Sequence, residues 1–261
     1  MTRGEIWTQN MLETPRAVPS ATRSVLAVDG TLDGEPWRAI AVVSDAEGAF
    51  PRARSGEAGL EEGLALAATV RDAPRGTAIL AIVDVPGQAF GRREEAAGLH
   101  LMLGAAVEAY AMRRQSGEQV FALVVGHAIS GAFLAHGMQA GWIGALRDAE
   151  IEIHVMSAAS VARVTRATPQ EVARMATIVP ATARDVETFE RFGAIDRLFA
   201  VRDARTPTPD ELALVRETLV GARAAHDGVR PPRSRLERGG AHETRAAALA
   251  VRAAMRRAWD A

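Results

Sequence analysis

Apolar residues along this chain gather in short runs separated by glycine, proline and charged residues. The runs at residues 24–29 and 37–44 are rich in strand-forming residues, and the segment between them predicts a hairpin-like connection. The runs at residues 78–83 and 120–125 are apolar without alternation, which is typical of strands covered on both faces. We expect the second of these strands to end at Gly126.

Between and after these runs, apolar positions recur at helical spacing. This spacing predicts helices over residues 57–71 and 92–115, and a further helix that begins near Gly131. Short strands are expected at residues 142–146 and 151–155. The alternation of strand, glycine turn and helix predicts an α/β fold with right-handed crossovers.

Two later segments share one helix-start pattern. Residues 168–171 are Thr-Pro-Gln-Glu and residues 208–211 are Thr-Pro-Asp-Glu. In each, threonine can cap the helix, proline suits the first helical position and glutamate closes a capping box. Both segments predict helix starts and carry no chemistry.

The two ends of the chain are expected to lie outside the main domain. Pro15 and Pro19 interrupt any periodicity, so residues 1–22 are interpreted as an irregular N-terminal tail. Residues 23–230 are expected to form the domain. Residues 231–261 are interpreted as a linker and a C-terminal helix.

Composition narrows the chemistry that the chain can support. The chain has 261 residues, of which 48% are hydrophobic, so it can bury a core. Its 31 basic and 32 acidic residues nearly cancel, so nucleic-acid binding is not expected. Every basic residue is arginine, and cysteine is absent. These absences exclude Schiff-base chemistry, lysine-linked biotin, thiolate metal sites and cysteine nucleophiles on this chain.

Further absences bear on location and metal binding. No apolar run approaches the roughly 20 residues of a membrane-spanning helix, and residues 1–10 lack the apolar core of a signal peptide. We therefore expect a soluble, cytoplasmic protein without a membrane partner. No His-Glu-x-x-His or similar ligand spacing occurs, so a metal site is not expected.

The most informative segments are two glycine-rich turns that follow the buried strands. In the second, residues 126–133 read Gly-His-Ala-Ile-Ser-Gly-Ala-Phe. A strand-to-helix turn of small residues leaves backbone N–H groups unpaired, and these suit an anion or a developing oxyanion. Close packing of helix against strand is the alternative interpretation.

The first turn spans residues 84–91, Asp-Val-Pro-Gly-Gln-Ala-Phe-Gly. Pro86 fixes φ while Gly87 frees it, which gives the loop a defined and unusual course. Asp84, or the pair Glu94 and Glu95 that follows, could act as acid, base or helix cap. Acidic residues at such positions usually complement the helix dipole.

Together these segments resemble a known family. Residues 83–95 (Val-Asp-Val-Pro-Gly-Gln-Ala-Phe-Gly-Arg-Arg-Glu-Glu) and 126–137 (Gly-His-Ala-Ile-Ser-Gly-Ala-Phe-Leu-Ala-His-Gly) resemble the gamma subunit of biotin-independent malonate decarboxylase. More distantly they resemble the C-terminal half of acyl-CoA carboxyltransferases. Residues 50–57 and 155–165 also resemble the malonate decarboxylase gamma subunit, and the resemblance covers about residues 25–198. It implies an α/β crotonase-like (ClpP/crotonase) fold, a spiral of ββα units with additional C-terminal helices.

The resemblance also implies an activity and partners. In this family the gamma subunit pairs with a related beta subunit and decarboxylates a malonyl thioester to an acetyl thioester and CO2. The malonyl group rides on an acyl carrier protein through a phosphoribosyl-dephospho-CoA arm. The acyl-transferase alpha subunit is a further expected partner. No biotin and no other covalent cofactor is implied on this chain.

Site residues follow from the same resemblance. The backbone amides of Gly131 and Ala132 are expected to hold an oxygen of the substrate, either the enolate oxygen or that of the leaving carboxylate. His127 is the candidate that orients substrate or donates a proton. The residues expected to bind substrate are Pro86, Gly87, Gln88, Gly126 and Ser130.

Two alternatives stay open at the level of sequence. The chain could be a non-catalytic scaffold whose arginines and C-terminal helix bind partners. It could instead be a thioester hydrolase in which Ser130 acts with His127 or His136 and with Asp84 or Asp148. The second alternative departs from Gly-x-Ser-x-Gly, because residue 128 is alanine.

Two other histidines are expected to have structural roles. His136 is expected to make a structural hydrogen bond, and His100 to lie on a packed helix face.

Overall fold

The described strands of the computed structural model form one eight-stranded sheet in the order β1-β2-β3-β4-β5-β6-β8, with β7 paired to β5. The structure describes residues 1–156, 158–179, 182–238 and 240–260. The pairs β1–β2 and β2–β3 are antiparallel, and the others are parallel. The strands are β1 Glu13–Val18, β2 Val25–Leu32, β3 Glu35–Val42, β4 Ala78–Val85, β5 Val120–Ile129, β6 Trp142–Arg147, β7 Ile153–His154 and β8 Arg197–Ala200.

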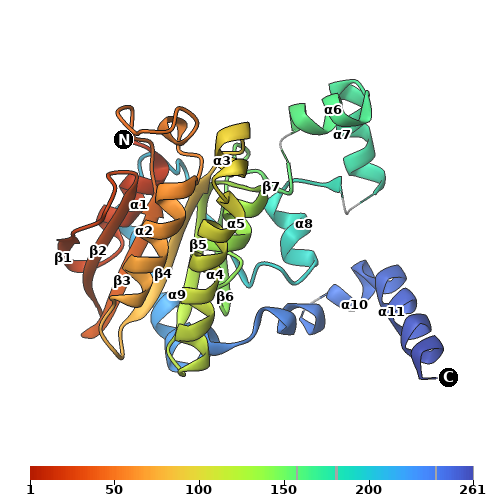
Figure 1. Ribbon diagram of the computed structural model, residues 1–261. Helices are drawn as coiled ribbons and strands as arrows, with labels where there is room; N and C mark the ends of the chain where they lie inside the picture. Colours follow the sequence, from red (N-terminus) through yellow and green to blue (C-terminus); the bar gives the residue numbers. More distant parts are fainter. Residues whose placement is uncertain (157, 180–181, 239, 261) are drawn as a thin grey trace.

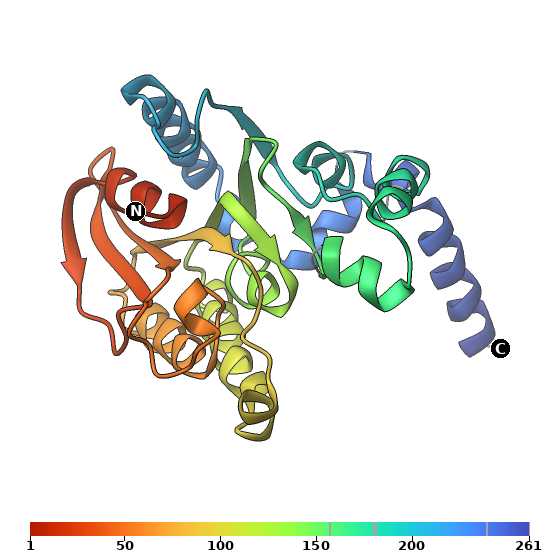
Figure 2. The same ribbon diagram turned by 90° about the horizontal axis from the view of Figure 1, so that it is seen from above.

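Helices cover both faces of this sheet. Figure 2 shows α2 and α4 on one face and α1 and α9 on the other, while α6, α7 and α11 stand away from the sheet in Figure 1. The helices are α1 Arg3–Asn10, α2 Leu60–Arg71, α3 Arg92–Ala96, α4 Leu99–Gln115, α5 Ser130–His136, α6 Ala158–Thr165, α7 Pro169–Ile178, α8 Val186–Arg191, α9 Pro209–Ala224, α10 Ala241–Thr244 and α11 Ala246–Trp259. None of the described helices is both long and apolar enough to cross a membrane.

The core is centred on β4 and β5. Residues 78–83 and 120–125 are all buried, as expected for strands with a helical layer on each face. A row of aromatic rings runs across the sheet from β3 to β8, with centroid spacings of 4.9, 6.3 and 6.4 Å. Its members are Trp37, Phe121, Trp142 and Phe199. The apolar runs therefore identified the central strands correctly.

Local signals in the sequence are also confirmed. The hairpin between β2 and β3 turns at Asp33 and Gly34, whose φ angles are +51° and +76°. Two consecutive positive φ angles match the twist of the flanking strands. Capping boxes open α7 at Thr168 and α9 at Thr208.

The expectation of an irregular tail over residues 1–22 is wrong. Thr2 and Glu5 form a capping box that opens α1, and β1 pairs with β2 as an edge strand. Trp7 is fully buried, and its indole N–H donates to the carbonyl oxygen of Ala204 at 2.8 Å. Burial of a large aromatic side chain stabilises a helix too short to persist alone.

Two expected boundaries also differ. The helix predicted over residues 92–115 is two helices, α3 and α4, because Gly98 has a φ of +86°. The strand expected to end at Gly126 continues to Ile129. Glycine is needed at 126 for space, since a Cβ there would lie 1.9 Å from Oδ1 of Asp84.

The segment after residue 230 is not a loose linker in its described part. Arg235 is buried, and its guanidinium donates to the carbonyl oxygens of Met138 and Ala140. Arg238 forms an ion pair with Asp196. Gly239, within the same segment, lies outside the described residues. The final helix ends at Trp259 and buries none of its residues within this chain.

Candidate active site

The first glycine turn follows β4 and is fixed by a short backbone bridge. The N–H of Ala58 donates to the carbonyl of Gly87 at 2.9 Å, and the N–H of Ala89 donates to the carbonyl of Ala58 at 2.8 Å. Gly87 has a φ of +148°, a value at which a Cβ is disfavoured. The backbone on both sides of Gln88 is therefore held in place.

The second glycine turn joins β5 directly to α5. Ser130, the first residue of α5, has a φ of +64°. A left-handed backbone costs a non-glycine residue on the order of 1 kcal/mol, so surrounding contacts must hold it. The sharp turn places the Ser130 side chain and the Gly131 backbone amide at the carboxyl edge of the sheet.

The two turns meet through the side chain of Gln88. Its Oε1 accepts hydrogen bonds from the Ser130 hydroxyl at 2.7 Å and from the Gly131 N–H at 2.6 Å. A backbone N–H can only donate, so the atom that faces Gly131 is the carboxamide oxygen. Two of the residues expected to bind substrate, and one expected catalytic residue, are thus in direct contact.

A cavity of about 270 Å³ opens beside this contact. Its walls include Pro86, Gly87, Gln88 and Ser130, which were grouped from sequence as substrate-binding residues. The rest of its lining is Arg52, Glu57, Phe90, Ile129, Met156, Ser160 and Arg163.

An ion pair forms part of the cavity lining. Arg52 donates two hydrogen bonds of 2.6 Å to Glu57, and its guanidinium lies 4.4 Å from the ring centroid of Phe90. The hydrogen bond from Glu57 raises the pKa of Arg52 above its ordinary value. The charges of Arg52 and Glu57 offset each other, and Arg163 on α6 adds an exposed cation to the lining. A guanidinium can bind an anionic group of a substrate.

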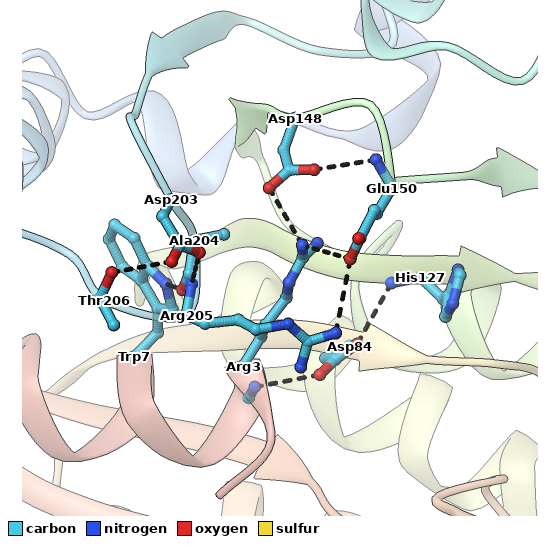
Figure 3. A network of polar contacts seen from close by, with 11 residues as sticks. Arg3, Trp7, Asp84, His127, Asp148, Glu150, Asp203, Ala204, Arg205 and Thr206 are labelled. Carbon is cyan, nitrogen blue, oxygen red and sulfur yellow. Dashed lines mark hydrogen bonds and ion pairs between the residues drawn. The ribbon is translucent and has the colours of Figure 1, made fainter.

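Gly126 and His127 line a different hollow, of about 150 Å³. The backbone N–H of His127 donates to Oδ1 of Asp84 at 3.2 Å, and the N–H of Gly4 donates to Oδ2 at 3.1 Å. Figure 3 shows the imidazole of His127 directed away from Asp84. Asp84 therefore anchors backbone from α1 and β5.

An ion cluster closes the far side of this hollow. Figure 3 shows the Arg3 guanidinium between Asp148, at 3.0 Å, and Glu150, at 2.8 Å. Arg205 reaches the same Glu150 at 3.4 Å. Sequence reasoning missed this cluster because it placed Arg3 in an unstructured tail. The signal that could have revealed it is the Thr-x-x-Glu pattern at residues 2–5.

The other predicted site residues differ in their exposure to solvent and in their position. Gly131 is half-exposed, whereas Ala132 is 1% exposed, so the Ala132 side chain is packed away from the cavity. Glu94 and Glu95 lie in the first turn of α3, the position where carboxylates complement a helix dipole.

The histidines divide between core and surface. His136 is fully buried, its Nδ1 lies 2.8 Å from the Tyr110 hydroxyl and its Nε2 lies 3.1 Å from the carbonyl of Ile82. A carbonyl can only accept, so Nε2 carries the proton and Nδ1 accepts from Tyr110. Burial lowers the pKa of His136 to about 4. The structural role expected for His136 is confirmed, and the packed position expected for His100 is wrong because its side chain is exposed.

The geometry does not form a hydrolase triad. The Ser130 hydroxyl donates to Gln88, and both ring nitrogens of His136 are engaged in the core. The acceptor that an activated serine needs is a histidine nitrogen, and none bonds to Ser130 among the described residues. Within the same residues, no three histidine, aspartate or glutamate side chains gather as a metal site would require.

Comparison with known proteins gives a consistent result. The family model described as malonate decarboxylase gamma subunit (MdcE) matches residues 53–259. A solved Pseudomonas malonate decarboxylase hetero-tetramer in complex with coenzyme A is similar, with 42% identity and a TM-score of 0.87 over 99% of this chain and 100% of that one. The Pseudomonas MdcD-MdcE hetero-dimer gives 41% identity and a TM-score of 0.85 over 99% and 100%.

Two more distant similarities were found, one in sequence and one in structure. The Malonyl-S-ACP:biotin-protein carboxyltransferase MADD of Malonomonas rubra is 34% identical over 190 residues, which are 69% of this chain and 65% of that relative. The chain therefore spans about 65% of the length of the curated relative it matches. A transcarboxylase 12S structure gives a TM-score of 0.64 at 15% identity, over 85% of this chain and 40% of that one. This last likeness concerns the fold alone and confirms the expected crotonase-like α/β class.

Proposed function

The chain belongs to the malonate decarboxylase gamma subunit family, and on that premise we propose that it acts with a homologous beta subunit to decarboxylate a malonyl thioester. The products are an acetyl thioester and CO2. The similar Pseudomonas proteins form a hetero-tetramer and an MdcD-MdcE hetero-dimer, which supports a hetero-oligomer for this chain. A malonate decarboxylase is a carboxy-lyase.

The proposed chemistry needs a site for a developing negative charge. Loss of CO2 from a malonyl thioester leaves an enolate whose charge lies largely on the thioester oxygen. Donors fixed at that oxygen stabilise the transition state more than the ground state. Removal of one such donor typically costs about 10²–10³ in rate.

One observation carries the proposal. The Gly131 N–H and the Ser130 hydroxyl hold a carbonyl oxygen, that of Gln88, at 2.6 and 2.7 Å. These donors therefore already have the spacing that a substrate carbonyl or carboxylate oxygen would require. In the proposed complex the Gly131 amide is one donor to the enolate or the leaving carboxylate. The backbone amide of Ala132, the next residue of α5, is proposed as the other donor.

The thioester arm is proposed to enter beside Arg163. This arginine adds an exposed cation to the cavity lining, whereas the nearby Arg52 is paired with Glu57. A guanidinium suits the phosphates of an acyl carrier protein's phosphoribosyl-dephospho-CoA arm. The similarity to a coenzyme A complex supports an arm of this kind. The acyl-transferase alpha subunit is proposed as a further partner.

His127 is proposed as the group that protonates the enolate carbon. Its side chain is exposed at the carboxyl end of β5, three residues before Ser130, and lines the separate hollow beside Asp84. The proposal therefore requires the enolate carbon to face that hollow while its oxygen is held at Gly131. His127→Gln should then lower kcat and leave folding unchanged.

The test is release of CO2 from a malonyl thioester. It uses the beta subunit alone, this chain alone, and the two together. Activity that requires both chains supports the proposal, and full activity of the beta subunit alone contradicts it.

A second candidate function is that of a non-catalytic scaffold whose backbone amides do not contact substrate. The observation that favours it is the hydrogen bond from the Gly131 N–H to Gln88, which already occupies this donor. Variants at Gly131 and Ala132 distinguish the two, because a scaffold predicts no effect on turnover.

A further inference from the structure

The Gln88 carboxamide occupies the place that the proposed function assigns to a substrate oxygen. Its Oε1 accepts hydrogen bonds from two donors there, the Ser130 hydroxyl and the Gly131 N–H. A Cβ at Gly131 would lie 2.6 Å from the same Oε1. The carboxamide oxygen therefore fills the space directly over the amide, and a second oxygen cannot enter while it stays.

The side chain can leave this place without movement of the backbone. The two hydrogen bonds between the flanking residues and Ala58 fix the main chain, and Ala58 and Ala89 are buried. The Gln88 side chain itself is only half-buried and borders the 270 Å³ cavity. Rotation about its side-chain bonds would carry the carboxamide into that cavity, which is a low-energy change between staggered rotamers.

We propose that Gln88 is a specificity-determining residue, whose side-chain carbonyl holds the donors in the free enzyme until a thioester or carboxylate oxygen displaces it. The inference rests on the proposed function of the Gly131 amide. It follows that a ligand gains only the difference between its own hydrogen bonds and those of Gln88. A ligand without an acceptor oxygen cannot make the exchange, because it would leave two donors unpaired.

The test compares three substitutions in the complex of this chain with its beta subunit. Gln88→Ala removes the competing oxygen. Gln88→Asn keeps the carboxamide but shortens the side chain by one carbon, so it no longer reaches both donors from a fixed backbone. Gln88→Glu keeps the length and adds a charge, which strengthens hydrogen bonds to N–H and O–H donors. Gln9→Ala, at an exposed glutamine on α1, is the matched control.

The decisive readout is equilibrium binding of S-acetyl-pantetheine, a thioester that cannot lose CO2, measured by calorimetry. Gln88→Ala and Gln88→Asn should bind it roughly three- to tenfold more tightly than the parent. Gln88→Glu should bind it more weakly than the parent, by roughly threefold or more. Gln9→Ala should match the parent. In turnover assays the same changes should appear in KM for malonyl thioester.

Other results would overturn the inference. Equal or weaker binding by Gln88→Ala and Gln88→Asn would mean that Gln88 supports the site and does not compete for it. A fall in kcat of tenfold or more with unchanged binding would mean that Gln88 itself contacts the transition state. If the parent complex releases no CO2, the proposed decarboxylation fails, while the binding order of the variants still decides the role of Gln88.

Discussion

The carboxylate of Asp84 accepts a hydrogen bond from the backbone N–H of His127 at 3.2 Å and so ties the end of β4 to β5 (Figure 3). The same carboxylate accepts the N–H of Gly4 at 3.1 Å. The parallel ladder between β4 and β5 is irregular between Val83 and Val85. A side chain therefore completes the join between these strands, shortly before the turn that carries Ser130.

Gly126→Ala should disrupt this join. The added Cβ would meet Asp84 Oδ1 at 1.9 Å, so the carboxylate or the strand must shift. We expect a loss of about 2–4 kcal/mol in the free energy of unfolding, measured by urea denaturation. Gly104→Ala is the control, because nothing lies within 4 Å of its Cβ on α4. It should stabilise by about 0.5–1 kcal/mol, and an equal effect of both variants would contradict the account.

Arg3→Met should destabilise the protein and loosen α1. The Arg3 side chain is 7% exposed, and its loss leaves the 16%-exposed Asp148 without its cation. We expect a loss of about 2–4 kcal/mol in the free energy of unfolding. This is somewhat less than is typical for breaking a fully buried ion pair, because Glu150 is exposed. Arg23→Ala breaks a pair that is 79% exposed on both sides and should change little. Hydrogen exchange of α1 checks the result, and unchanged protection in Arg3→Met would refute the role of the cluster.

The free energy of unfolding should decrease as the pH is lowered, because His136 is buried in its neutral form. Its pKa is about 4 in the fold because burial disfavours the imidazolium, against about 6.5 in the unfolded chain. Above pH 6.5 both states are neutral and the contribution is complete. As the pH falls from 6.5 towards 4, the unfolded chain binds the proton and about 3 kcal/mol is lost. His136→Gln should flatten this part of the profile, and His100→Gln, at an exposed site, should not.

Ser130→Ala should retain measurable decarboxylation. Removal of its hydroxyl takes away one donor to the carbonyl position, so a loss of no more than about 10²–10³ in kcat is expected. A serine-directed phosphonate should leave Ser130 unmodified, because its hydroxyl is bonded to Gln88 and to no histidine among the described residues. Stoichiometric labelling of Ser130 would instead support a covalent mechanism.

The parts of the fold that the sequence predicted are those with local causes. The continuous apolar runs at residues 78–83 and 120–125 identified β4 and β5, and the capping boxes at Thr168 and Thr208 identified helix starts. Helix α1 has a capping box of the same kind at Thr2, but it is eight residues long and has no proline at its start. Its stability comes from Trp7, whose bonding partner lies 197 residues away, and no local pattern contains that information.

The site was predictable in its residues and not in its contacts. Motif resemblance grouped Gln88, Ser130 and Gly131, and the structure brings these three together. The hydrogen bond of Gln88 to both donors depends on how Ala58 holds the first turn beside the second. Strand β5 also continues past Gly126, so His127 lines the hollow on the Asp84 side. The position of a side chain on one side of a strand or the other follows from the strand register, and the sequence by itself does not specify that register.

The most direct test is the turnover of malonyl thioester by the two-chain complex carrying Gly131→Val or Ala132→Pro. Proline removes one backbone N–H within the first helical turn, and valine at 131 obstructs the approach to the amide. With assembly and folding confirmed for each variant, CO2 release should fall by about 10²–10³. Parent rates of CO2 release in both folded, assembled variants would contradict the proposal that these amides stabilise the reacting oxygen.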